Sequence, residues 1–480
     1  MDSDLCYLPA TEALEAFRSK RLSPVDLLRA LIARAEETEP HLNAFTDRYF
    51  DEALEGAREA EHRYAGGASA PGALEGIPVA VKDEPEIEGK RTTQGSLLLE
   101  HHISDQDAYI VERLRSAGAI FHARTATPEF CLLFQTHSRL HGVTRNPWNL
   151  EITPGGSSGG SAASLAAGSA TLATGSDIGG SIRQPASMCG LVGYKPPYGR
   201  NPENLPFSLD IFNHQGPIAR TVADCALMQN VMSGPHPRDI ATVRPKINIP
   251  IPIETDLRGR RIAWSIDLGY LDVDPEIADN TRAILDLLRD LGAVVEEVNP
   301  GWTARVDRAA LDYYDFMVGG QIDRFAGQRL DLLTDYARDS VERSRRIHPS
   351  RLLKALELCG EMYETFGPMM ENYEVFICPT ATTTRVPAGF NYLHDGIRIN
   401  GREIEPEMGI AMTHQFNMLS RCPVLAVPSG MAANGIPTGI QIVGKTYDDL
   451  AVFRTGAALE KDHPWFAGRS TRPACGGRKA

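Results

Sequence analysis

The apolar residues near the start of the chain recur every three or four positions, which is the spacing of one face of a helix. Ser23 and Pro24 suit the N-cap and the first turn of such a helix, and its apolar face continues through Ile32. A second helix is predicted over residues 51–64, and the glycines and prolines at 66–72 end it. The N-terminal part of the chain is therefore expected to be helical.

A different pattern follows. Residues 77–81 are apolar and mostly β-branched, which predicts a buried strand with Lys82 at its carboxyl end. Further on, a helix with Asp107 as its N-cap precedes the strand-like residues 119–123, and the same order of helix and strand returns in residues 274–298. This alternation predicts an α/β architecture with a central sheet.

The last third of the chain separates into two parts. Residues 303–375 have mostly helical patterns, whereas three apolar runs from Val375 onward read as strands that complete the sheet: residues 375–380, 423–430 and 439–444. The final residues, 466–480, are locally basic and are expected to form a flexible tail.

The composition is that of an ordinary globular protein and excludes several classes of partner. The 480 residues are 42% hydrophobic and 23% charged, and 49 Lys and Arg against 62 Asp and Glu give a net charge of -13. This charge repels phosphate backbones, so no nucleic-acid partner is expected. The eight cysteines form no C-x-x-C pair, and no signal peptide begins the chain, so we expect a cytoplasmic protein without membrane contact.

The stretch from Thr153 to Gly190 is unusually rich in glycine and serine, and four interpretations compete for it. A flexible linker is disfavoured because residues 165–175 are apolar and patterned. A phosphate-binding loop lacks the required lysine motif. The elbow of an α/β-hydrolase would make Ser157 the nucleophile, with His214 or His414 as candidate base, but no hydrophobic strand precedes it.

The fourth interpretation combines serine with lysine. Gly179 and Gly180 precede Ser181, so the backbone can bend sharply there and direct several N–H groups toward one point. Such donors form an oxyanion hole, and each contributes roughly 3 to 4 kcal/mol to transition-state stabilisation. Lys82, at the end of an apolar strand, is a candidate base, because burial disfavours its ammonium form and a neutral amine accepts a proton.

These residues resemble the amidase signature family, whose members hydrolyse amides and related acyl compounds with a Ser-Ser-Lys triad. The resemblance rests on GGSSGGSAA, GSDIGGSIRQPA and CGLVGYKP, and on the lysine segment EGIPVAVKD, and it extends from Ser23 to about Glu460. It implies one large α/β domain over residues 1–465, with a central mixed β-sheet flanked by helices. No metal or other cofactor is implied.

The resemblance also implies a role for each residue of the triad. Ser181 corresponds to the acylated nucleophile, Ser157 to a bridging serine that follows a cis peptide bond, and Lys82 to the general base. The separation of 24 positions between the two serines selects Ser157 over Ser158. The amides of the implied oxyanion hole are those of Ile178, Gly179, Gly180 and Ser181.

The expected substrate is a small amide or carbamate, such as an aryl acylamide or a urethane. Residues 302–370 are expected to shape its pocket, and residues 130–134 are further candidates for the pocket wall. The glutaminase-type chain of a tRNA-dependent amidotransferase is an alternative, but residues 317–353 depart from the tyrosine-rich segment of that branch. A stand-alone hydrolase, monomeric or homodimeric, is therefore favoured, and a Ser-His-Asp esterase is the second alternative.

Overall fold

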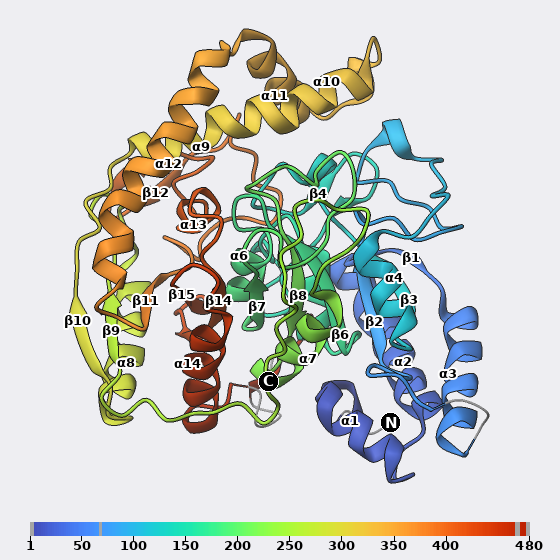
Figure 1. Cartoon of the computed structure of the whole chain (residues 1–480). Helices are drawn as coiled ribbons and strands as arrows, with labels where there is room; N and C mark the ends of the chain where they lie inside the picture. Colours follow the sequence, from blue (N-terminus) through green and yellow to red (C-terminus); the bar gives the residue numbers. More distant parts are fainter. Residues whose placement is uncertain (1–3, 67–69, 466–470, 477–480) are drawn as a thin grey trace.

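The computed structural model describes residues 4–66, 70–465 and 471–476. One sheet of 11 strands runs through the molecule (Figure 1). Its strands pair in both directions: β2 lies parallel to β3 and β6, whereas β6 and β8 are antiparallel. In sheet order the strands are β1 (Phe45–Arg48), β3 (Ile120–Thr125), β2 (Pro78–Lys82), β6 (Leu172–Ser176), β8 (Gln215–Ala219), β7 (Val192–Lys195), β14 (Val424–Met431), β15 (Pro437–Gly444), β11 (Val375–Pro379), β9 (Arg261–Trp264) and β10 (Val294–Glu297). This large mixed sheet with flanking helices confirms the predicted fold class.

Helices cover both faces of the sheet, and the core is divided accordingly. Strand β11 shows the division, because Ile377 packs into one apolar cluster and Phe376 into another, as expected where successive side chains point to opposite faces. The flanking helices are α1 (Ala10–Arg18), α2 (Pro24–Leu42), α3 (Phe50–Tyr64), α4 (Tyr109–Ser116), α5 (Gly159–Ala167), α6 (Arg183–Cys189), α7 (Val222–Met232), α8 (Pro275–Asp290), α13 (Gln415–Met418) and α14 (Asp449–Asp462).

The local signals in the sequence are mostly confirmed. Ser23 caps α2, since its Oγ accepts a hydrogen bond from the amide of Val25 at 3.0 Å. The expected start of α4 is wrong by one residue, because Ala108 occupies the N-cap. The Asp107 carboxylate is used elsewhere: it pairs with Arg115 at 2.6 Å and accepts from the amide of Glu88 at 2.8 Å.

A group of helices stands over one end of the sheet, drawn in yellow and orange at the top of Figure 1. It consists of α9 (Arg305–Tyr314), a π-helical turn (Asp315–Gly319), α10 (Gly320–Ala326), α11 (Asp335–Arg346) and α12 (Pro349–Met370). π-Helical turns inside helices occur frequently at functional sites. Here the turn carries Asp315 and Val318 into the wall of a cavity that also contains Ser181.

The C-terminal residues lie partly outside the described part of the chain. Residues 466–470 and 477–480 of the expected tail are among those outside it. Between them, Cys475 is buried, and its amide donates to the carbonyl of Pro147 at 3.2 Å. Within the ranges that the structure describes, none of the helices has the length and apolar character needed to cross a membrane.

Candidate active site

Lys82 lies at the carboxyl end of β2 and is fully buried. Its Nζ lies 2.7 Å from Ser157 Oγ, 2.7 Å from Ser176 Oγ and 3.1 Å from Glu84 Oε2. An ammonium group has three N–H donors, so each of them has one acceptor in this arrangement. Strand β2 and these three acceptors therefore hold the amine in a fixed place.

The charge state of Lys82 differs from the expectation. Burial by itself would lower the pKa of Lys82, but Cys131 and the Glu84 carboxylate outweigh it, and the pKa is raised above its ordinary value. The Cys131 thiol is itself buried, which raises its pKa to about 11, so at neutral pH the compensating negative charge is that of Glu84. The pKa of Lys82 is therefore shifted in the direction opposite to the one that burial alone would give.

Ser157 lies in the loop before α5, directly after a cis peptide bond between Gly156 and Ser157. Gly156 is packed against backbone: a Cβ atom there would lie 2.6 Å from the carbonyl oxygens of Leu133 and Gln135. No larger residue fits this position, which accounts for part of the glycine content of the stretch.

Ser181 lies in the loop between β6 and α6, and it lines the cavity together with Ile178 and Gly179. Its carbonyl accepts a hydrogen bond from the amide of Ser158 at 3.2 Å, but no hydrogen bond joins the hydroxyls of Ser157 and Ser181 among the described contacts. Within the residues that the structure describes, no protein acceptor pairs with the backbone amides of the implied oxyanion hole. These are the amides of Ile178, Gly179, Gly180 and Ser181.

A buried ion pair between Asp177 and Arg183 supports the Ser181 loop from both of its ends. Arg183 donates to both carboxylate oxygens of Asp177, at 2.8 and 2.9 Å, and neither side chain is exposed. Asp177 Oδ2 also accepts from the amide of Ile182 at 3.2 Å. Burial alone would raise the pKa of Asp177, but the Arg183 guanidinium outweighs it and holds that pKa well below its usual range.

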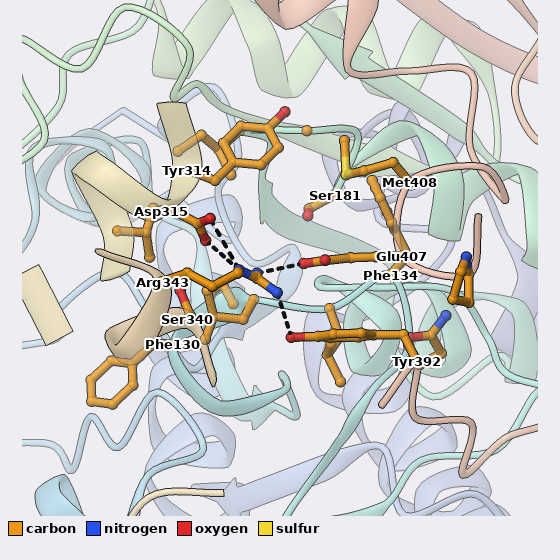
Figure 2. Close-up of a pocket in the computed structure, with 18 residues that line it drawn as sticks. Phe130, Phe134, Ser181, Tyr314, Asp315, Ser340, Arg343, Tyr392, Glu407 and Met408 are labelled. Carbon is orange, nitrogen blue, oxygen red and sulfur yellow. Dashed lines mark hydrogen bonds and ion pairs between the residues drawn. The ribbon is translucent and has the colours of Figure 1, made fainter. Parts of the chain in front are cut away.

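The cavity beside Ser181 has a volume of about 660 Å3, measured out to its mouth (Figure 2). Its wall is largely apolar and confirms the predicted contributions of residues 130–134 and of the segment 302–370. The apolar wall consists of Phe130, Leu132, Leu133, Phe134, Ile178, Val318 and Met408. The hydroxyl of Tyr314 lies over Gly179 and has no hydrogen-bond partner in the described part of the chain.

One charged cluster interrupts this apolar wall. Arg343 forms ion pairs with Asp315 at 2.9 Å, with Glu407 at 2.9 Å and with Asp339, and it also contacts the hydroxyl of Tyr392. Burial raises the pKa of Asp315 to about 6 and that of Glu407 to about 7. Figure 2 shows the guanidinium of Arg343 between these groups, in the same cavity as Ser181.

The histidines proposed for a Ser-His-Asp arrangement have other partners. His214 hydrogen-bonds to the carbonyls of Asp177 and Ser420, and His414 pairs with Asp307 at 2.7 Å. Ser157 Oγ accepts a hydrogen bond from Lys82 Nζ at 2.7 Å. Among the described residues, no group of three or more His, Cys, Asp or Glu is arranged to hold a metal ion.

Glu84, Ser176 and Cys131 surround the amine of Lys82, and sequence reasoning missed the first two and assigned Cys131 only to the pocket wall. For Glu84 a signal was available, because residues two apart at the end of a strand point to the same side. Cys131 could not have been found in this way. It comes from a short turn far from Lys82 in sequence, and only the tertiary fold brings the thiol to within 3.5 Å of Glu84 Oε2.

Comparison with known proteins identifies the family of this chain. The family model described as Amidase matches residues 26–453. The acylamidase of Rhodococcus erythropolis is 33% identical over 479 residues, 97% of this chain and 97% of that protein. A glutamyl-tRNA(Gln) amidotransferase chain of Carboxydothermus hydrogenoformans is also 33% identical, over 96% of this chain and 98% of its own.

A solved structure gives the same result at the level of the fold. The crystal structure of a bacterial aryl acylamidase of the amidase signature family is similar to this chain with a TM-score of 0.91 and 28% sequence identity. The similarity covers 99% of each chain. The protein therefore belongs to the amidase signature family and is an amide-hydrolysing enzyme.

Proposed function

We propose that this enzyme cleaves the C–N bond of small amides through an acyl-enzyme, with Ser181 as nucleophile, Ser157 as proton relay and Lys82 as general base. The observation that carries the proposal is the 2.7 Å hydrogen bond between Lys82 Nζ and Ser157 Oγ. This bond lies beside the Ser181 loop, whose amides at residues 178–181 have no protein acceptor in the described part of the chain. A relay requires a hydroxyl between the amine and the nucleophile, and Ser157 supplies one.

The chemical steps follow from this arrangement. Neutral Lys82 accepts a proton from Ser157, which takes one from Ser181 as the Ser181 oxygen bonds to the substrate carbonyl carbon. The four unpaired amides of the loop stabilise the oxyanion that forms. The C–N bond then breaks as the leaving amine takes the proton back through Ser157, and a water molecule activated by the same relay releases the acid.

Two features of the free enzyme fit a relay that is completed by substrate. The hydroxyls of Ser157 and Ser181 are not yet joined, and catalytic hydrogen bonds of free enzymes commonly tighten only in the substrate complex. Cys131 and Glu84 together raise the pKa of Lys82, which favours its ammonium form. Turnover is therefore expected to rise with pH as the neutral amine forms.

We assign the substrate to the aryl or alkyl amides, with carbamates as a second substrate class. The apolar wall formed by side chains such as Phe130 and Phe134 suits an apolar acyl or leaving group of moderate size. The likeness to an acylamidase and to an aryl acylamidase supports this class. Free glutamine, the substrate expected of a glutaminase-type chain, has no large apolar group that would pack against these side chains.

The test is a panel of p-nitroanilides, p-nitrophenyl esters, aryl carbamates and glutamine, each assayed with the wild type and with Ser181→Ala. Loss of anilide hydrolysis by at least ~1000-fold in the variant is expected, since the nucleophile is removed. Labelling by a fluorophosphonate, mapped by mass spectrometry, is expected on Ser181. Labelling of Ser157 instead, or substantial anilide turnover by Ser181→Ala, would contradict the proposal. Turnover of glutamine alone would reassign the substrate.

A further inference from the structure

Glu84 occupies a position beside the proposed base that the relay itself does not explain. Its Oε2 lies 3.1 Å from Lys82 Nζ and also accepts a hydrogen bond from Ser176 Oγ. Ser176 in turn accepts from Lys82 at 2.7 Å, so the three groups form a closed ring of hydrogen bonds. The Glu84 side chain is only 12% exposed, so solvent screens this ion pair weakly.

Of the two neighbouring carboxyl groups, those of Glu84 and Glu203, that of Glu84 carries the negative charge. Gln215 Nε2 lies 3.5 Å from Glu84 Oε1, and the carboxyl of Glu203 lies nearby. Burial and the charge of Glu84 raise the pKa of Glu203 to about 8, so Glu203 is mostly protonated at neutral pH. Burial alone would raise the pKa of Glu84, but Lys82 outweighs it and the pKa is lowered. One ionised carboxylate therefore faces one ammonium.

The other groups around Lys82 carry no charge at neutral pH. Ser157 and Ser176 are hydroxyls, and the Cys131 thiol keeps its proton because burial raises its pKa to about 11. Removing the carboxylate of Glu84 would leave a buried amine without an anionic partner. Desolvation would then favour its neutral form.

We propose that Glu84 is a positioning residue for the base: it holds the Lys82 amine between Ser157 and Ser176 and decides the pH at which that amine becomes a proton acceptor. The inference rests on the proposed role of Lys82. It goes beyond that role because it assigns the pH range of the enzyme to a residue outside the relay. The wild type is expected to lose activity steeply below the pH at which Lys82 gives up its proton to solvent.

The experiment measures the rate of Ser181 labelling by a fluorophosphonate from pH 5.5 to 10, which requires no knowledge of the natural substrate. In Glu84→Gln the acid limb of this profile is expected to move to lower pH by one unit or more. Where both enzymes are on the acid limb, the variant should then react at least about tenfold faster than the wild type. In Glu84→Asp, which keeps the charge but withdraws it by one methylene, a smaller shift in the same direction is expected.

Glu39→Gln is the matched control, since Glu39 is another buried glutamate, and its Oε2 accepts from the amides of Ala44 and Phe45. It should change thermal stability without moving the acid limb. An acid limb that does not move in folded Glu84→Gln overturns the proposal. Absence of labelling of this variant at every pH also overturns it, because the Glu84 carboxylate would then be a direct proton acceptor. If Glu84→Gln does not fold, an unmoved limb in Glu84→Asp overturns it. Failure of the wild type to be labelled at Ser181 would instead refute the proposed function.

Discussion

The ion pair beneath the Ser181 loop allows a quantitative prediction. Asp177→Asn keeps the size of the side chain and removes its charge, so Arg183 is left fully buried without its anionic partner. Arg183 retains three other acceptors, at 2.6 to 2.9 Å: the carbonyl of Thr413 and the side chains of Gln441 and Asn417. These acceptors are neutral and cannot replace the carboxylate charge.

The magnitude follows from the burial of the pair. Removing one partner of a buried ion pair costs about 3–5 kcal/mol, because the other charge stays desolvated. Unfolding entropy amounts to about 2.1 cal/mol/K per residue, which for 480 residues is about 1 kcal/mol/K. The melting temperature of Asp177→Asn should therefore fall by about 3–5 °C. Because the pair also fixes the amides of the Ser181 loop, kcat should fall by roughly 100-fold.

Calorimetry and anilide hydrolysis at pH 8 test both parts of this prediction. Asp279→Asn is the control, since Asp279 pairs with Arg282 at 2.9 Å on the surface, where both side chains are more than half exposed. Exposed pairs contribute little, so neither the melting temperature nor kcat should change in the control. A melting temperature of Asp177→Asn within about 1 °C of the wild type, with kcat unaltered, would refute the reasoning about the buried charge.

Two further substitutions test the packing of the loop and the pH dependence of stability. In Gly180→Ala the new Cβ would lie 1.9 Å from Thr413 Oγ1, at a backbone φ of 137°, so kcat should fall by roughly 100-fold. Gly360→Ala is the control, because the space around Gly360 is open, and it should leave kcat unchanged. Burial raises the pKa of Glu460 to about 8, so its contribution to stability is full below pH ~4.3 and is lost as the pH rises through 8. Calorimetry from pH 5 to 9 should therefore show Glu460→Gln gaining stability over the wild type as the pH rises, and a constant difference would contradict the assigned pKa.

Much of the fold and the core of the site could be predicted because their signals are local. The cap at Ser23 and the buried strand before Lys82 each depend on a few adjacent residues. The glycines of residues 153–190 report backbone shapes and close approaches that no other residue permits, as at Gly156 and Gly180. The resemblance of the motifs to the family then predicted that Lys82 pairs with Ser157, 75 residues later in the chain. No periodicity in the sequence could have predicted this contact.

The cavity was predictable only in outline. The segment around residues 302–370 could be assigned to its wall, but the cluster around Arg343 could not. Its acidic partners Asp315, Asp339 and Glu407 come from three separate elements, and none lies in a motif. Charged side chains are common on helix surfaces, so only the tertiary meeting of Asp315, Arg343 and Glu407 in the cavity distinguishes them from solvated residues, whereas Asp339 pairs with Arg343 one turn apart on α11.

The charge on Lys82 shows where residue-by-residue reasoning fails. Burial of an amine lowers its pKa, and a sequence reveals burial well, so a neutral lysine is the natural expectation for the end of an apolar strand. The outcome is reversed by one carboxylate two positions further on, because the interaction of two ions at 3.1 Å inside a protein is comparable with the desolvation of either. The state of a buried base is therefore a property of a pair. In the proposed relay that pair is Lys82 and Glu84, and the pH profile of Ser181 labelling is the measurement that tests it.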